Sequence, residues 1–99
     1  MARMKAYTKE EIAFASAIYI WLNANSEIGK TGRYRKEVIS RLSVENIERF
    51  DRAIEYLKEI KLMVSNHSGY MLIRKSASSD FPTQGQQTTT ERLYGKPFA

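Results

Sequence analysis

The order of hydrophobic patterns between residues 33 and 75 constrains the fold of this chain more than any other feature. Two segments repeat apolar residues at the spacing of helix turns, a short one and then a longer one, with a turn at residues 43–45 between them. Two short runs of strand-forming residues follow, and the sequence Asn-His-Ser-Gly at 66–69 connects them. The sequence therefore predicts two consecutive helices that lead directly into a β-hairpin.

Each of these helices has one apolar face. We expect the first over residues 33–42 and the second over residues 45–60, with Ser43 as the N-cap of the second. The residues expected to face the core are Tyr34, Val38, Ile39 and Leu42 in the first helix, and Ile47, Phe50, Ala53, Ile54, Leu57 and Ile60 in the second. The strands are expected over residues 62–65 and 70–73, with Gly69 free to adopt a positive φ. A hairpin of this length is not stable alone, so it should pack on the helices.

An earlier helix is predicted from about Lys9 to Asn23, because residues 8–11, Thr-Lys-Glu-Glu, form a capping-box pattern. One face of this helix carries Phe14, Ala15, Ile18 and Leu22, and a nearly opposite apolar face carries Ala13, Ala17 and Ile20, with Trp21 at its border. A helix that is apolar on two sides needs a second cover. We expect the second face to form a homodimer contact; the alternative is cover from this chain's own hairpin or tail.

The composition changes at residue 76. Residues 76–90 are polar and poor in apolar side chains, which is typical of a disordered or loosely packed segment. Residues 91–99 regain Leu93, Tyr94 and Phe98, so they form either a docking arm for a protein partner or a flexible end. The sequence therefore predicts a folded domain over 1–75 and a flexible polar tail over 76–99.

Positive charge is concentrated in one part of the chain. The 16 Lys and Arg residues exceed the 11 acids, for a net charge of +5. Residues 30–41 hold five bases and one acid, whereas residues 45–61 hold five acids and four bases. A local basic segment suits a polyanion or an acidic partner, and the alternative is a solvated basic surface.

Several classes of chemistry find no support in the sequence. The chain has no cysteine, which leaves out disulfides and thiolate metal sites and fits a reducing cytoplasm. His67 is the one histidine and has no second ligand to share a metal. The apolar run at residues 12–22 is about half the length of a membrane span. We therefore expect neither an enzyme nor a cofactor, a metal site or a membrane segment.

The segment from residue 37 to residue 57 resembles the helix-turn-helix of winged-helix regulators. In those proteins an Ala-x-x-x-Leu helix end precedes a Gly-Leu-Ile entry into the wing. Ala53 and Leu57 match the first pattern here, and Lys61-Leu62-Met63 takes the place of the second, with lysine at the glycine position. The resemblance covers roughly residues 5–75 at the level of the superfamily. It implies an α+β fold: a three-helix winged helix-turn-helix with a C-terminal β-hairpin wing and a disordered tail.

The resemblance also implies binding to double-stranded DNA, as a small transcriptional or replication regulator that occupies its site. With the second apolar face of the first predicted helix, we expect the chain to bind as a homodimer. In such modules the third helix enters the major groove, while the second helix and the wing contact the backbone. The residues expected near base edges are Asn46, Arg49 and Arg52. Those expected near phosphates are Arg33, Arg35, Lys36 and Arg41 before the turn, with His67, Arg74 and Lys75 on the hairpin.

The acids of the third predicted helix favour a different class of function. Glu48, Glu55 and Glu59 share its solvent face, and Glu45–Arg49 and Glu48–Arg52 have the spacing of helix ion pairs. Such pairs would leave the arginines as surface residues without a ligand. The alternative is thus a winged-helix protein-interaction module, an adaptor or inhibitor of another complex, that uses its tail or its acidic third helix.

Overall fold

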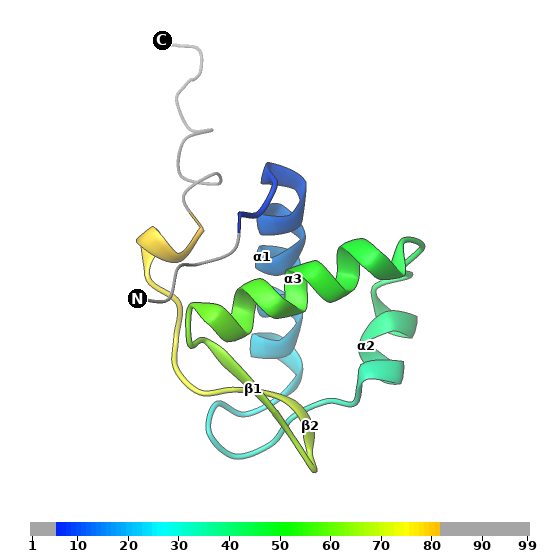
Figure 1. Cartoon of the computed structure of the whole chain (residues 1–99). Helices are drawn as coiled ribbons and strands as arrows, with labels where there is room; N and C mark the ends of the chain where they lie inside the picture. Colours follow the sequence, from blue (N-terminus) through cyan, green and yellow to red (C-terminus); the bar gives the residue numbers. More distant parts are fainter. Residues whose placement is uncertain (1–5, 82–99) are drawn as a thin grey trace, which may run out of the picture.

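A computed structural model describes residues 6–81 of the 99-residue chain. The elements are α1 (Lys9–Asn25), α2 (Arg35–Arg41), α3 (Ile47–Glu59), β1 (Met63–Asn66), β2 (Gly69–Leu72) and a short 3-10 turn, η1 (Ser78–Asp80) (Figure 1). The predicted α+β order of three helices followed by an antiparallel hairpin is confirmed. The predictions for residues 82–99, including the docking arm at 91–99, lie outside the described residues.

The first helix begins where its capping box predicts. The backbone N–H of Glu11 donates to Oγ1 of Thr8 at 3.1 Å, and the backbone N–H of Thr8 donates to Oε1 of Glu11 at 3.0 Å. The helix ends at Asn25, two residues later than expected, and Ser26 closes it by donating from both its backbone N–H and its hydroxyl to the oxygen of Leu22. Local hydrogen bonds therefore determine both ends of α1.

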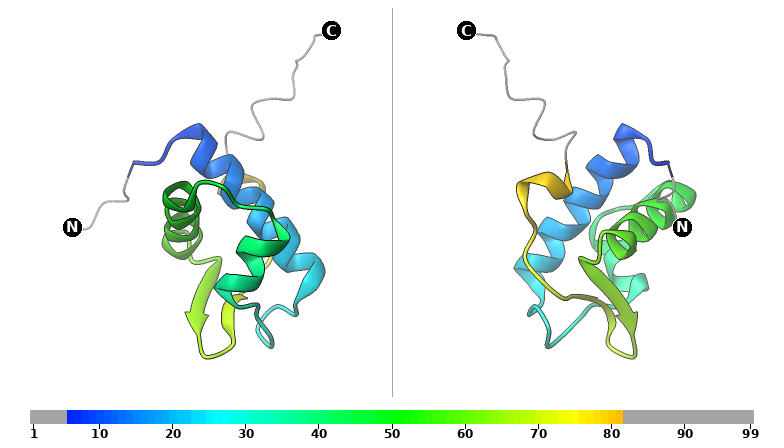
Figure 2. Two further views of the ribbon diagram at one scale, coloured as in Figure 1. Left: turned by 90° about the vertical axis from the view of Figure 1, so that its right-hand side faces the viewer. Right: turned by 60° about the vertical axis from the view of Figure 1, so that its left-hand side comes forward.

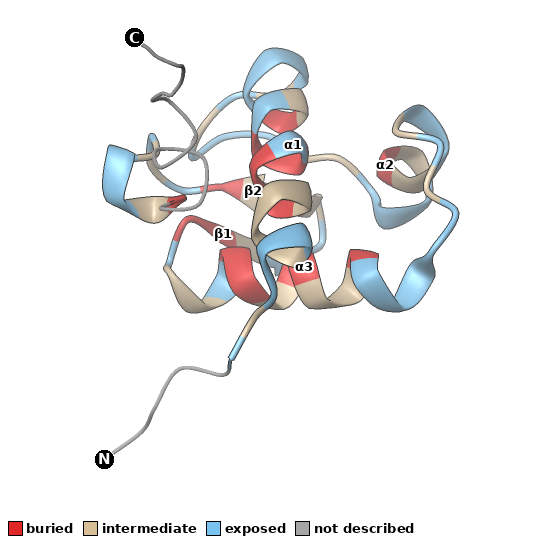
Figure 3. Ribbon diagram, turned by 90° about the horizontal axis from the view of Figure 1, so that it is seen from above, coloured by how far each residue is buried: buried red, intermediate tan, exposed pale blue. Residues whose placement is uncertain are grey.

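The core lies where α1, α3 and the hairpin face one another, as the buried segments in Figure 3 show. Its largest fully buried side chains are Phe50, Ile18, Leu22, Leu57, Leu62, Met63, Leu72 and Val38. Each large apolar side chain that leaves water contributes roughly 1.5–3 kcal/mol, so this cluster is the main source of stability. In both views of Figure 2 the hairpin projects below the helices.

Three predictions about α2 and α3 are wrong. The N-cap of α3 is Asn46, whose Oδ1 accepts from the N–H of Arg49 at 3.0 Å, whereas Ser43 lies in the turn with φ of 52°. Ile47 is 41% exposed because it occupies the first turn of α3, before the buried stripe begins at Phe50. Tyr34 is 63% exposed because α2 begins one residue after it, at Arg35.

The exit from α3 places Lys61 in a conformation that glycine adopts more easily. Lys61 adopts the left-handed conformation, with φ of 61°. The N–H of Leu62 donates to the oxygen of Leu57 at 3.0 Å, and the N–H of Lys61 donates to that of Lys58 at 3.1 Å. These two bonds form a Schellman motif. The backbone therefore makes the usual helix ending, and the lysine carries the strain of a positive φ.

The hairpin has a two-residue turn at His67 and Ser68. Asn66 pairs with Gly69 and Met63 pairs with Leu72, so each strand is shifted by one residue from its expected range. Gly69 has φ of 94°, which confirms the predicted role of this glycine. The Oδ1 of Asn66 accepts from the N–H of Ser68 at 2.8 Å and stabilises the turn.

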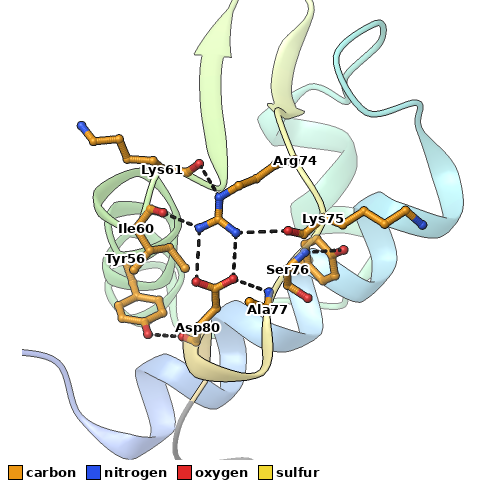
Figure 4. A network of polar contacts seen from close by, with 9 residues as sticks. Tyr56, Ile60, Lys61, Arg74, Lys75, Ser76, Ala77 and Asp80 are labelled. Atoms are coloured by element: carbon orange, nitrogen blue, oxygen red, sulfur yellow. Dashed lines mark hydrogen bonds and ion pairs between the residues drawn. The ribbon is translucent and has the colours of Figure 1, made fainter.

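Residues 74–81, the strap, continue the packed unit beyond the expected boundary at residue 75. Arg74 donates to both carboxylate oxygens of Asp80, at 2.9 and 3.2 Å, and to the main-chain oxygens of Ile60 and Lys61, at 2.6 and 3.2 Å (Figure 4). Phe81, at the end of the strap, is 8% exposed. The folded unit therefore includes residues up to Phe81.

The strap also covers one flank of α1. The ring of Phe81 lies 6.1 Å from that of Tyr19 on α1 and 6.2 Å from that of Tyr56 on α3. Ala17 and Ile20 remain exposed, Ile20 at 63%, while Ala13 is partly buried and Trp21 packs partly against the core. The homodimer contact at these four residues stays a prediction.

Candidate nucleic-acid interface

Two glycines let the connector before α2 touch the hairpin turn. Arg33 and Tyr70 form a β-bridge, with N–H to oxygen distances of 3.0 and 2.8 Å. A Cβ on Gly32 would lie 2.6 Å from the oxygen of Tyr70, and one on Gly69 would lie 2.3 Å from that of Arg33. Any other residue at either position would force the two segments apart. We call this contact, residues 31–34 against residues 67–70, the junction.

Arg35 connects three elements instead of presenting a free charge. Its guanidinium donates to Asp51 on α3 and lies 3.4 Å from the hydroxyl of Tyr70 on β2. It also lies over the ring of Phe50, 5.4 Å from the centroid. The hydrogen bond with Asp51 raises the pKa of Arg35 further above its usual value. Arg35 therefore positions α2 against α3 and the hairpin.

Arg33 is also engaged within the chain. Its Nε donates to the main-chain oxygen of Asn25 at 2.7 Å, and its Nη1 lies 3.4 Å from a carboxylate oxygen of Glu37. The first contact fastens the connector to the end of α1. Of the four cations expected before the turn, Arg33 and Arg35 thus have structural partners.

Arg52 faces the segment that enters α1. It donates to the main-chain oxygen of Ala6 and to Oε2 of Glu11 at 3.3 Å, and its guanidinium lies 4.6 Å from the centroid of the Tyr7 ring. Its helix partner is Glu55 at 3.6 Å, whereas the sequence spacing favoured Glu48. The side chain expected near base edges therefore holds the N-terminal segment against α3.

Tyr7 completes this contact between the N-terminal segment and α3. Its hydroxyl donates to Oε2 of Glu59 at 3.2 Å, and its ring packs edge-on against that of Tyr56, with 5.2 Å between centroids. Burial, together with the hydrogen bond to Glu59, raises the pKa of Tyr7 to about 12. The hydrogen bond from the N–H of Thr8, followed by that from Arg52, lowers the pKa of Glu11. Nothing in the local sequence pattern connects Tyr7 to Glu59, 52 positions away, so its role is visible only in the structure.

Five of the ten predicted DNA-binding side chains are exposed and have no hydrogen bond or ion pair with other described residues. They are Lys36, Arg41, Arg49, His67 and Lys75. The other five are occupied: Arg33, Arg35, Arg52 and Arg74 by the contacts above, and Asn46 as the N-cap of α3. The available cations lie on α2, the first turn of α3 and the strap, and His67 adds an exposed imidazole in the hairpin turn.

The exposed side of α3 is acidic. At 100° per residue, the positions opposite Phe50 are Glu48, Arg52, Glu55 and Glu59, and Asp51 lies on the flank between the two sides. A shallow hollow of about 430 Å³ on this side is lined by Glu11, Asn46, Glu48, Arg49, Asp51 and Arg52. Charge alone therefore does not favour the approach of a polyanion along the middle of α3.

Residues 6–81 contain neither a helix able to cross a membrane nor a cluster of side chains that could hold a metal ion. Comparisons with family models, with curated proteins and with solved structures found no match to this chain.

Proposed function

We propose that this chain is a winged helix-turn-helix protein that binds double-stranded DNA, chiefly through phosphates. The order helix, bridging strand, helix, helix and hairpin supports the fold assignment. The observation that carries the function is the junction, which holds the hairpin turn beside the start of α2 (Figure 1), while Arg35 connects both to α3. Exposed cations on α2 and in the first turn of α3 would then contact the backbone of a bound duplex.

The free side chains favour affinity over sequence recognition. Lys36 and Arg41 on α2 and His67 in the hairpin turn lie outside α3, where phosphates are the accessible groups. On α3 only Arg49 remains for a base edge, because Asn46 and Arg52 have internal partners. An arginine can make two hydrogen bonds to guanine. We therefore infer weak sequence preference on top of strong electrostatic attraction.

The proposed role is that of a small transcriptional or replication regulator that acts by occupying its site. A homodimer through Ala13, Ala17, Ile20 and Trp21 of α1 would present two copies of the interface to one duplex. Exposed Ile20 supports this arrangement, since α1 has no described partner on that side.

The salt dependence of binding to random duplex DNA tests the proposal. The logarithm of the binding constant should fall steeply with the logarithm of the salt concentration, with a slope of about 0.9 per phosphate neutralised. Lys36→Ala and Arg41→Ala should each reduce that slope by about one. Lys9→Ala is the matched control, because Lys9 is an exposed lysine at the start of α1. No binding at low salt, or an equal loss in the control, would refute the proposal.

Arg49→Ala distinguishes recognition of the base sequence from electrostatic attraction to any DNA. If Arg49 reads a base, its loss should reduce the preference between sites by about 1–3 kcal/mol. Selection of sites from a random pool with wild type and variant measures this change. An unchanged preference would show that α3 does not read sequence.

The acidic side of α3 favours a second candidate, a protein-interaction module. Glu48 is an exposed acid of α3 that lines the hollow, and a basic segment of a partner would complement it. Replacing Glu48 with Ala should strengthen DNA binding if the chain binds DNA, because a repulsive charge is removed. If the chain instead binds a cationic protein through this surface and does not bind DNA, the same variant should weaken that protein complex.

A further inference from the structure

No contact within the described part of the fold explains why residue 34 carries an aromatic ring. It is 63% exposed, and in the described part of the chain its side chain makes no hydrogen bond or ring contact. The backbone of Tyr34 is the N-cap of α2, but its side chain takes no part in that cap. Among the described residues, nothing covers the ring, so it is accessible to a ligand.

The junction holds the backbone of Tyr34 rigidly. The residue before it is bonded in both directions to Tyr70, and the oxygen of Tyr34 accepts from the N–H of Val38 at 3.0 Å. The missing Cβ of Gly69 leaves the hairpin close to the nitrogen of Tyr34, where a Cβ would lie 2.8 Å away. The ring thus projects from a braced extended residue, with φ of −72° and ψ of 149°. A side chain on such a support loses little backbone entropy when it binds.

The surroundings of Tyr34 indicate what the ring would meet. Lys36, two residues along the chain, is exposed and free among the described residues. His67, in the hairpin turn on the other side of the junction, is exposed as well. A tyrosine combines an apolar ring with a hydroxyl donor, and tyrosines are among the side chains that bond phosphate oxygens. An exposed aromatic ring close in sequence to an exposed lysine suits a ligand with both apolar and anionic surface.

We propose that Tyr34 contacts the sugar–phosphate backbone of bound duplex DNA, with its ring against a deoxyribose and its hydroxyl donating to a phosphate oxygen. This contact rests on the proposed function. It adds an uncharged anchor to the cations of α2. Because Tyr34 lies outside α3, the contact increases affinity for every sequence alike.

Salt titrations of the full chain distinguish this contact from a charge effect. Tyr34→Ala should weaken duplex binding about tenfold, the equivalent of one aromatic contact, at every salt concentration. Tyr34→Phe keeps the ring and should weaken it about threefold. The salt slope should stay at the wild-type value in both variants, because no charge is removed, whereas Lys36→Ala should reduce it. Thermal unfolding of both variants should match the wild type.

Fluorine NMR gives a direct readout of the ring. With 3-fluorotyrosine at all six tyrosines, the Tyr34 resonance is assigned by its absence in Tyr34→Phe. Addition of duplex DNA should shift or broaden this resonance more than those of Tyr19 and Tyr56, which are buried. Ile73→Ala, which removes another exposed apolar side chain at the other end of the hairpin, is the control for affinity.

The outcomes separate this contact from the function on which it depends. Three results would each overturn the Tyr34 contact while leaving DNA binding intact. The first is equal affinity of Tyr34→Ala and wild type for duplex DNA, and the second is an equal loss of affinity in Ile73→Ala. The third is a Tyr34 resonance that does not change when DNA is added. No wild-type binding at low salt would overturn both.

Discussion

The strap offers the sharpest test of how this small domain is stabilised. Phe81 inserts its ring beside Tyr19 and Tyr56, and Asp80 accepts two hydrogen bonds from Arg74. Both contacts fasten the same eight-residue segment, and the hydroxyl of Tyr56 adds a hydrogen bond to the main-chain oxygen of Asp80. We therefore predict that Phe81→Ala and Asp80→Asn are strongly non-additive, because either change loosens the segment on which the other residue acts.

The magnitudes follow from burial and hydrogen bonding. Phe81 is 8% exposed, and truncating a buried phenylalanine costs about 3 kcal/mol at the lower end of the usual range. Asp80→Asn keeps the shape of the side chain but removes its charge and replaces one accepting oxygen with an NH2 group, so only one of the two bonds from Arg74 can remain. The side chain of Arg74 is 39% exposed, so solvent screening limits this loss to about 1 kcal/mol. The double variant should lose about 3 kcal/mol, and additive effects would give about 4.

Equilibrium unfolding in urea, followed by far-ultraviolet circular dichroism, measures these free energies by linear extrapolation. Ser79→Ala, at an exposed residue of η1 beside Asp80, is the control and should change stability by less than about 0.5 kcal/mol. A loss below about 1 kcal/mol for Phe81→Ala would show that the strap is not part of the core. Additivity within about 0.5 kcal/mol would show that the two residues act independently.

Three further predictions concern backbone contact and pH. Gly32→Ala should unfold at lower urea than Gly29→Ala, because its Cβ would meet the backbone of the hairpin, whereas Gly29 has open space and carries only the strain of φ 75°. Arg74 holds the pKa of Asp80 below its usual value. The stability that Asp80 contributes is therefore present above about pH 4 and is lost as the pH falls further. The difference in unfolding free energy between wild type and Asp80→Asn, measured in urea, should therefore shrink in acid. Burial raises the pKa of Tyr7 to about 12, so wild type should lose stability between about pH 10 and pH 12 in thermal melts, and Tyr7→Phe should lose less.

Local interactions made much of the fold predictable. The capping box at Thr8 and Glu11, the apolar stripe around Phe50 and Leu57, and the glycine in the hairpin turn each act within a few residues, so the sequence reveals them directly. The start of α3 was misplaced because two capping residues, Ser43 and Asn46, lie close together in the turn, and the structure uses the second. The sequence does not reveal the strap, because its composition after residue 75 is polar and single residues, Asp80 and Phe81, hold it in place.

The amino-acid sequence by itself determined the order of helices and strands and the excess of positive charge. Only the tertiary structure decided which cations are available to a ligand. Arg35 meets Asp51 16 positions away, and Arg52 meets Glu11 41 positions away. Exposed Tyr34 likewise depends on the contact between the connector and the hairpin turn. A charge becomes a binding group only where folding leaves it without an internal partner, and that depends on residues that are distant along the chain and adjacent in space.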